Sequence, residues 1–122
     1  MLDVVALCDS LPKGFAYGVF AKQLIRAASS VGANYRASGR GKSTADFINK
    51  LKIVEEEADE CGYFLDLLLA LHGTNKHETA RLLKESEEIL AMTVAAIKTA
   101  RNNKTKTRTS NIANRKSRGE SE

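Results

Sequence analysis

The feature that most constrains the fold is a line of apolar residues between residues 44 and 71, which recur in unbroken steps of four and three. An α-helix has about 3.6 residues per turn, so these steps keep the side chains on one side of the helix. A stripe sustained over this length is typical of a helix that packs along the seam of a helical bundle. The stripe comprises Phe47, Leu51, Val54, Ala58, Cys61, Leu65 and Leu68.

Three further helices are predicted around this one. A short apolar stretch before Pro12 predicts a first helix of about two turns. Residues 15–37 carry a second stripe, formed by Phe20, Leu24, Ala27, Val31 and Tyr35. Residues 76–101 carry a third, formed by Leu82, Ser86, Ile89, Thr93, Ala96 and Ala100. The pattern predicts an all-α fold, an antiparallel up-down four-helix bundle whose first helix is short.

Composition agrees with a single helical domain. The chain has 122 residues, only one proline and no tryptophan, so the turn residues that repeated hairpins need are sparse. Ser43, followed three residues later by Asp46, predicts a helix N-cap, so the third helix should begin near Thr44.

The net charge of +4 is unevenly distributed. Six basic and two acidic residues after Arg101 account for it, and this segment has almost no apolar residue. A segment of that composition buries too little surface to offset its ordering entropy, so we expect a bundle over residues 1–101 and a disordered basic tail over residues 102–122. Within the bundle, residues 13–52 are mainly basic, whereas residues 53–101 are mainly acidic.

No constellation of residues indicates catalysis. Glu56 and Glu60 share a helix face, but no Glu-x-x-His motif accompanies them, which favours a solvated or subunit-facing acidic surface over a metal site. The Gly-rich stretch at residues 39–43 lacks the G-x-x-x-x-G-K-[ST] pattern of a phosphate loop. We therefore expect a protein that is not an enzyme and that has no cofactor and no metal.

The two cysteines, Cys8 and Cys61, lie in apolar helical segments without metal-ligand spacing, so we expect buried free thiols in a reducing compartment. No export signal and no apolar run of about 18 residues is present. These observations favour a cytoplasmic protein that does not bind or span a membrane.

The basic residues are the stronger functional signal. Two interpretations of the bundle cations remain open: a patch that binds phosphates, or ion pairs with acids of the third helix or of a neighbouring subunit. The candidate nucleic-acid-binding residues are Arg26, Arg36, Arg40 and Lys42 in the bundle and Lys104, Lys106, Arg108, Arg115, Lys116 and Arg118 in the tail.

A second apolar stripe on the third helix predicts self-association. A helix with one buried face needs only one stripe, so part of this surface should meet another subunit. The candidate oligomer-interface residues are Ile53, Phe64, Leu67 and Leu71.

Several spaced motifs resemble a known family. They are Leu11-Pro12, residues 23–37 (QLIRAASSVGANYRA), Arg40, Ser43, residues 46–48, Lys50-Leu51 and residues 53–60 (IVEEEADE). Over roughly residues 5–101 the chain resembles the bacterial four-helix bundle proteins first noticed in intervening sequences of 23S ribosomal RNA genes. The resemblance implies an up-down bundle that forms homopentamers. A relative is the accessory protein of diversity-generating retroelements, which binds a reverse transcriptase and nucleic acid.

We therefore expect a homo-oligomeric scaffold, pentameric by the resemblance, that binds RNA, DNA or a nucleic-acid enzyme such as a reverse transcriptase. The alternative is a purely structural interaction module whose charged helices serve only subunit pairing.

Overall fold

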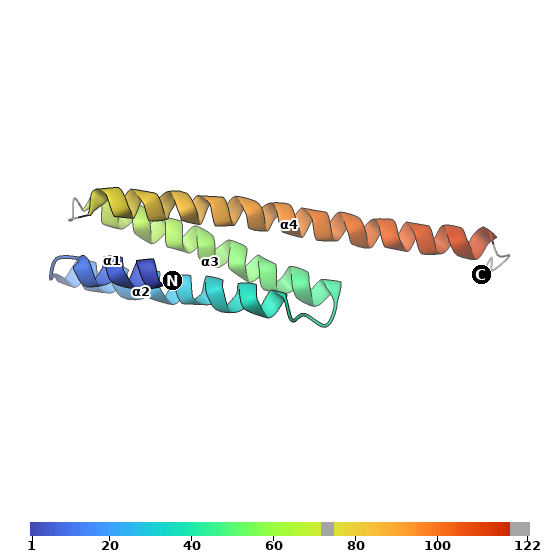
Figure 1. Ribbon diagram of the computed structural model, residues 1–122, viewed down its shortest axis with the longest axis horizontal. Helices are drawn as coiled ribbons and strands as arrows, with labels where there is room; N and C mark the ends of the chain where they lie inside the picture. Colours follow the sequence, from blue (N-terminus) through green and yellow to red (C-terminus); the bar gives the residue numbers. More distant parts are fainter. Residues whose placement is uncertain (72–74, 118–122) are drawn as a thin grey trace.

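The computed structural model describes residues 1–71 and 75–117, with side chains up to Thr105. Its elements are α1 (Leu2–Ser10), α2 (Phe15–Ser38), α3 (Thr44–Ala70) and α4 (Lys76–Ser117). Successive helices run in opposite directions, and the described ranges contain no strand (Figure 1). The predicted antiparallel four-helix bundle with a short first helix is confirmed.

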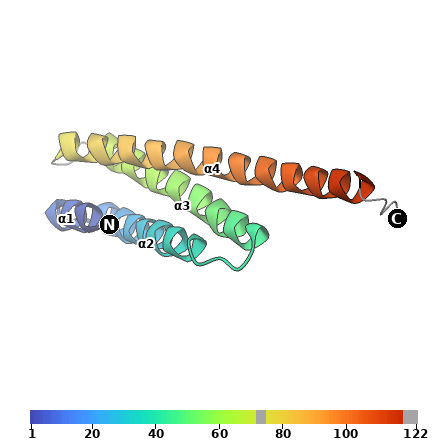
Figure 2. The ribbon, with the colours of Figure 1, turned by 45° about the vertical axis from the view of Figure 1, so that its right-hand side comes forward.

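α3 is the central helix of the bundle. It packs along both α2 and α4, whereas α2 and α4 make no close backbone approach to each other within the described ranges. The short α1 bridges α2 and α4 at one end, where it occupies the fourth corner of the bundle (Figure 2). The stripe with the longest regular repeat in the sequence therefore belongs to the helix with the most packing neighbours.

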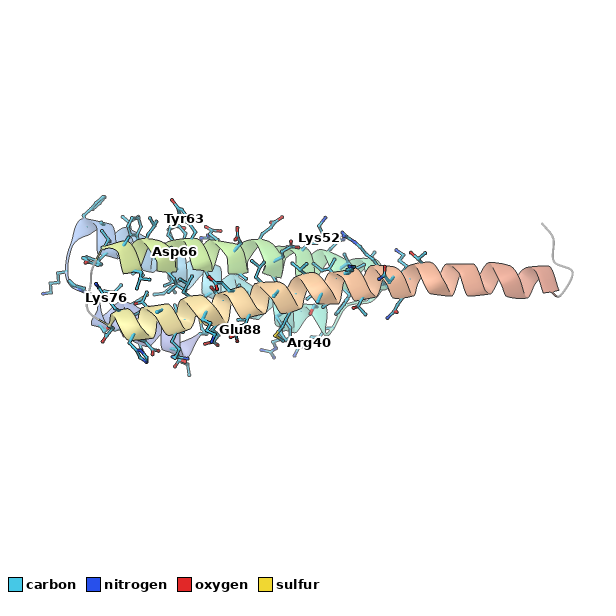
Figure 3. All side chains as sticks on the ribbon, turned by 90° about the horizontal axis from the view of Figure 1, so that it is seen from above. Arg40, Lys52, Tyr63, Asp66, Lys76 and Glu88 are labelled. Carbon is cyan, nitrogen blue, oxygen red and sulfur yellow. The ribbon has the colours of Figure 1, made fainter. Side chains whose placement is uncertain are left out.

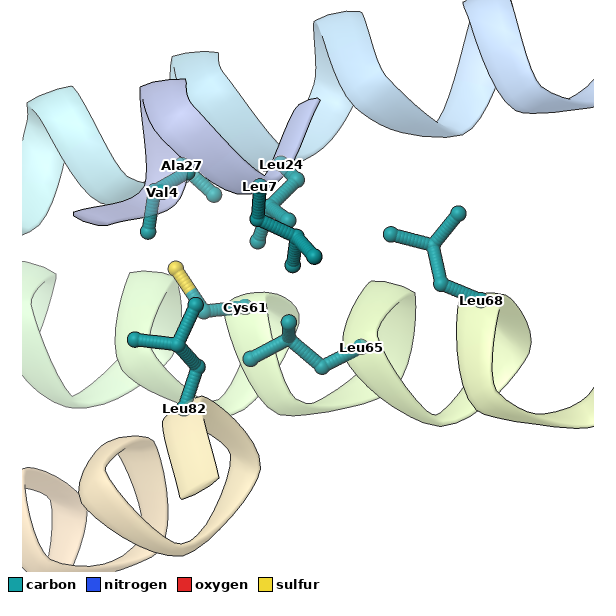
Figure 4. Packing of buried hydrophobic residues seen from close by; sticks show 8 residues of the cluster. All are labelled: Val4, Leu7, Leu24, Ala27, Cys61, Leu65, Leu68 and Leu82. Atoms are coloured by element: carbon teal, nitrogen blue, oxygen red, sulfur yellow. The ribbon is translucent and has the colours of Figure 1, made fainter. Parts of the chain in front are cut away.

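The core lies where all four helices meet. Val4 and Leu7 of α1 point toward Leu24 and Ala27 of α2, and Cys61, Leu65 and Leu68 of α3 and Leu82 of α4 complete the cluster (Figure 4). A second cluster, toward the other end of the bundle, consists of Ile48, Leu51 and Ile97, with Phe47, Ala96 and Ala100 packed against it. The predicted seam of α3 is buried except for Phe47, which is half-buried.

The predicted α3 boundary has a local cause. Ser43 is the N-cap, and its hydroxyl oxygen accepts a hydrogen bond of 3.1 Å from the backbone N–H of Asp46. The Asp46 carboxylate in turn accepts a hydrogen bond from the backbone N–H of Lys42. This exchange satisfies amides that have no partner within the helix, and it fixes the first turn of α3.

Tyr35 corrects the predicted core of α2. Its place in the apolar stripe indicated burial, but the side chain is 65% exposed. The reason is that α1 is too short to reach it: beyond Met1 the fourth corner is an apolar groove of about 470 Å³, which Leu51 and Ala58 line. Tyr35 therefore lies beside an open groove instead of a fourth helix.

The end of α4 corrects a second boundary. We expected the last helix to end near Arg101, but α4 continues to Ser117. No Gly or Pro occurs between Lys76 and Gly119, so no helix-breaking residue enforces an earlier end. Figure 1 shows this helix extending well past the end of α2 and α3. Residues 118–122 of the expected tail lie outside the described residues.

Candidate nucleic-acid interface

The loop between α2 and α3 gathers three of the candidate basic residues at one end of the bundle. Arg36 lies in the last turn of α2, and Arg40 and Lys42 lie in the loop. All three are exposed, and no ion pair joins them to an acid among the side chains described. Their charges are therefore available to a partner.

The loop is held close to α3 by a glycine. A Cβ atom on Gly41 would lie 3.3 Å from both the backbone nitrogen of Phe47 and the carbonyl oxygen of Ser38, closer than almost all real Cβ contacts. The N–H groups of Arg40 and Gly41 donate to the carbonyls of Ala37 and Ser38, which continues the end of α2 into the loop. This packing positions Lys42 at the N-terminus of α3.

An open hollow of about 550 Å³ with a mixed polar and apolar lining is shared by the start of α3 and by α4. Lys42, Ser43 and Thr44 line it from the start of α3, and Asn103 and Lys104 line it from α4. Lys42 belongs to the predicted basic set of the bundle, and Lys104 belongs to the predicted basic set of the tail. Two cations and the N-terminus of a helix all favour a negatively charged group at this place.

Arg26 is separate from this group. Its guanidinium pairs with Glu57 at 3.3 Å and with Glu60, both on α3. The hydrogen bond to Glu60 is the largest cause raising the pKa of Arg26 above its ordinary value. The sequence left two interpretations open for this residue. In the structure, Arg26 pairs with acids of the third helix.

The tail residues fall into two groups. Lys104 is exposed and lines the hollow. Lys106, Arg108, Arg115 and Lys116 lie on the α4 backbone beyond the described side chains, and Arg118 lies outside the described residues. That Lys42 and Lys104 line the same hollow was missed because we expected no helix after Arg101. The signal that could have revealed it is the helical register of Lys104.

Figure 3 shows how charged residues are placed along the bundle. Arg40 and Lys52 lie toward the end from which α4 projects, whereas Asp66 and Lys76 lie toward the opposite end, which therefore carries both signs of charge. At that opposite end Arg81 of α4 pairs with Asp3 of α1 at 3.0 Å and with Glu78 and Glu85 of its own helix. The free cations of the loop thus lie away from the ion-paired surface.

The four candidate interface residues are not equivalent. Ile53 is 36% exposed and Leu71 is 38% exposed, so both present apolar surface to solvent. Phe64 and Leu67 are half-buried, and Phe64 packs against the chain's own core with its ring centroid 6.2 Å from that of Phe20. Tyr63, in contact with Phe64 at 5.2 Å, is an exposed aromatic neighbour that the sequence stripe did not include.

Within residues 1–71 and 75–117 no group of three metal-ligating side chains lies close enough to hold an ion. Cys8 and Cys61 are free thiols. No helix of the part that the structure describes is long and apolar enough to cross a membrane.

The fold and this interface can be compared with known proteins. The 23S rRNA-intervening sequence protein family matches residues 1–95. The chain belongs to this family. A solved structure from Bacteroides thetaiotaomicron, a protein of unknown function from the S23 ribosomal protein family, is 35% identical in sequence with a TM-score of 0.72, and the match covers 80% of this chain and 90% of that chain. No protein with a curated description matches the chain.

The family match ends at residue 95, inside α4. The loop cations therefore lie within the 23S rRNA-intervening sequence region of the chain. Lys104 and everything after it lie beyond that region.

Proposed function

We propose that this 23S rRNA-intervening sequence protein is a non-enzymatic, homo-oligomeric scaffold that binds nucleic acid, or an enzyme that acts on it, through the basic end of the bundle. The observation that carries the proposal is the hollow that Lys42 and Lys104 both line at the N-terminus of α3. Phosphate groups are ligands that lysine cations attract.

The electrostatic setting supports a phosphate partner. Arg36, Arg40 and Lys42 are exposed, and Lys42 lines the hollow; Asp46, in the first turn of α3, accepts a hydrogen bond from the Lys42 backbone N–H at 3.3 Å. No aromatic side chain lines the hollow except Phe47. Binding at this end would depend on charge and shape more than on base identity.

Self-association strengthens the same proposal. Each subunit of an oligomer contributes one basic end, so weak phosphate contacts add through effective concentration without a new folded interface. The exposed Ile53 and Leu71, together with Tyr63, supply apolar surface for subunit contact. The pentameric state is the one that the family resemblance implies.

The alternative is a purely structural protein-protein module. The ion pairs of Arg26 with Glu57 and Glu60 favour it, because they use opposite charges of α2 and α3 within the protein. Under this alternative the loop cations have no nucleic-acid partner.

The test is retention of mixed-sequence RNA and DNA on a filter at two salt concentrations. Replacing Arg36, Arg40 and Lys42 by Gln should weaken binding and flatten the slope of log affinity against log salt by up to about 0.9 per lost contact. The matched control neutralises the exposed Lys13, Lys22 and Lys84, which lie toward the other end of the bundle, and should change the slope little. No retention by the unmodified protein at low salt would leave only the structural alternative.

A further inference from the structure

One line of residues on α4 changes from buried residues within the bundle to basic residues beyond it. The line is buried where α3 lies beside it, and its exposed fractions there are 5% at Leu82, 8% at Ser86, 5% at Thr93 and 4% at Ile97. The steps between these residues are four, seven and four. Continued with steps of seven, four and seven, the same line reaches Lys104, Arg108 and Arg115.

This alternation keeps the residues on one side of a straight helix. Steps of four and seven form an 11-residue repeat, or about 3.67 residues per turn, which is close to the natural period of the α-helix. The register that buries apolar residues against α3 therefore carries basic residues beyond the bundle. Arg101, three residues before Lys104, falls beside the same line.

The part of α4 that leaves the bundle is long enough to act as an arm. We define the arm as residues 101–117, which at 1.5 Å per residue spans roughly 25 Å. Figures 1 and 2 show this part of α4 without a neighbouring helix. Arg101 and Lys104 are exposed, and Lys104 lines the same hollow as Lys42, so the basic line begins at the proposed phosphate site.

We propose that the arm binds duplex DNA, with its basic line along the phosphates and its helix in the major groove. This inference rests on the proposed function and names the partner of that site. It also concerns a part of the chain outside the family match, which ends at residue 95.

The composition of the arm favours nucleic acid over a protein partner. Protein interfaces have an apolar or aromatic centre, whereas the arm contains no aromatic residue and only Ile112 and Ala113 as apolar residues. The other residues are Asn, Thr, Ser, Lys and Arg, the types that contact phosphates and sugars. Protein–DNA interfaces are polar and basic in this way.

The form of the nucleic acid follows from the same residues. Binding of single strands relies on aromatic side chains that stack on bases, and the arm has none. The major groove of B-form DNA, about 12 Å wide, admits an α-helix, whereas that of A-form RNA is too narrow and deep. Duplex DNA is therefore the partner that fits a helix with four of its six cations on or beside one line.

The test moves charges around the helix without changing composition. The off-line variant exchanges two pairs of residues, Arg108→Ser with Ser110→Arg and Arg115→Ala with Ala113→Arg, which moves two cations to the opposite side. The matched control, Lys106→Thr with Thr109→Lys and Lys116→Ser with Ser117→Lys, moves two cations that lie off the line to positions that are also off it. Both variants keep the net charge of +4 of the full-length protein.

Affinity for a 20-base-pair duplex of mixed sequence is measured as a function of salt. The off-line variant should bind about tenfold more weakly, and its slope of log affinity against log salt should be smaller by about 1.8, the value for two lost phosphate contacts. The affinity of the control should stay within about twofold of that of the unmodified protein. Equal effects in both variants would show an unstructured polycation and overturn the inference. Preference of the unmodified protein for duplex RNA or for single strands would overturn it as well.

The two proposals fail in different ways. If the unmodified protein binds nucleic acid but the two variants are indistinguishable, the arm inference is wrong and the proposed function stands. If the unmodified protein retains no nucleic acid at low salt, both are wrong.

Discussion

The Cys61 thiol is a buried, titratable group within the core. It lies on the α3 seam with 6% of its surface exposed, in the cluster shared by all four helices. Burial is the largest cause that raises the pKa of its thiol to about 11, and the charges of Glu57 and Glu60 add to it. The sequence predicted a buried free thiol from its place in the stripe. Glu57 and Glu60 lie four residues and one residue before Cys61 on the same helix, so their proximity also follows from the sequence.

The Cys61 pKa predicts a pH dependence of stability. The ordinary thiol pKa of 9.0 applies to the unfolded chain, so the unfolded state ionises first as the pH rises. The stabilisation is complete below pH 9.0 and is lost progressively as the pH rises toward about 11. Urea midpoints measured from pH 8 upward should fall more for the unmodified protein than for Cys61→Ala, whose position cannot titrate. Parallel curves for the two proteins would contradict the prediction.

Leu65 provides a direct test of the seam. Its side chain is 2% exposed in the centre of the larger core cluster. Leu65→Ala should lower the free energy of unfolding by about 2 to 5 kcal/mol, because both transfer energy and packing are lost. The control is Leu2→Ala, which removes a leucine that is 83% exposed and should change stability by less than about 0.5 kcal/mol. Equal denaturation midpoints for the two variants would mean that the wrong face was assigned to the core.

At the scale of helices, the sequence predicts periodic interiors better than ends. The stripe of α3 and the cap at Ser43 were predicted because both depend on residues within one or two turns. The end of α4 was not, because composition favoured disorder after Arg101 whereas the first glycine occurs only at residue 119. Tyr35 was misplaced because its burial depends on how far α1, a different helix, extends. The hollow of Lys42 and Lys104 likewise needed the relative placement of two helices.

Gly18 offers a gain in stability within α2. A Cβ atom at this position would meet no other atom within 4 Å, so no packing reason requires glycine there. Gly18→Ala should raise the free energy of unfolding by roughly 0.5 to 1 kcal/mol, because alanine loses less backbone entropy in a helix interior. A matched change is Gly62→Ala, whose new Cβ would lie 3.5 Å from the Ser86 hydroxyl and should give a smaller gain. A decrease in thermal midpoint for Gly18→Ala would show that α2 uses this glycine in a contact with another molecule.

At the scale of the whole molecule, the bundle has an ion-paired end, a basic end and an apolar outer surface on α3. The ion pairs of Arg81 join α1 to α4, and those of Arg26 join α2 to α3, so these two arginines are paired within the subunit. Arg36, Arg40 and Lys42 near the loop have no ion pair among the described side chains. This division explains why net charge alone predicted less about partners than the location of each cation.

The outer surface of α3 predicts an oligomer. Ile53 and Leu71 are each more than one-third exposed, and Tyr63, also on α3, is 59% exposed, which is apolar surface that a monomer would leave in water. Sedimentation at micromolar concentration should show an assembly larger than a dimer. Ile53→Glu should shift it toward smaller species without loss of helical circular dichroism, because the residue contributes little to the core.

Phe64 is unsuitable for this test, since it packs against Phe20 within the subunit. The control, Val94→Glu, changes an equally apolar residue on α4 that is 45% exposed and should leave the assembly intact. A monodisperse monomer for the unmodified protein would refute the predicted interface, and equal dissociation by both variants would place it elsewhere on the surface.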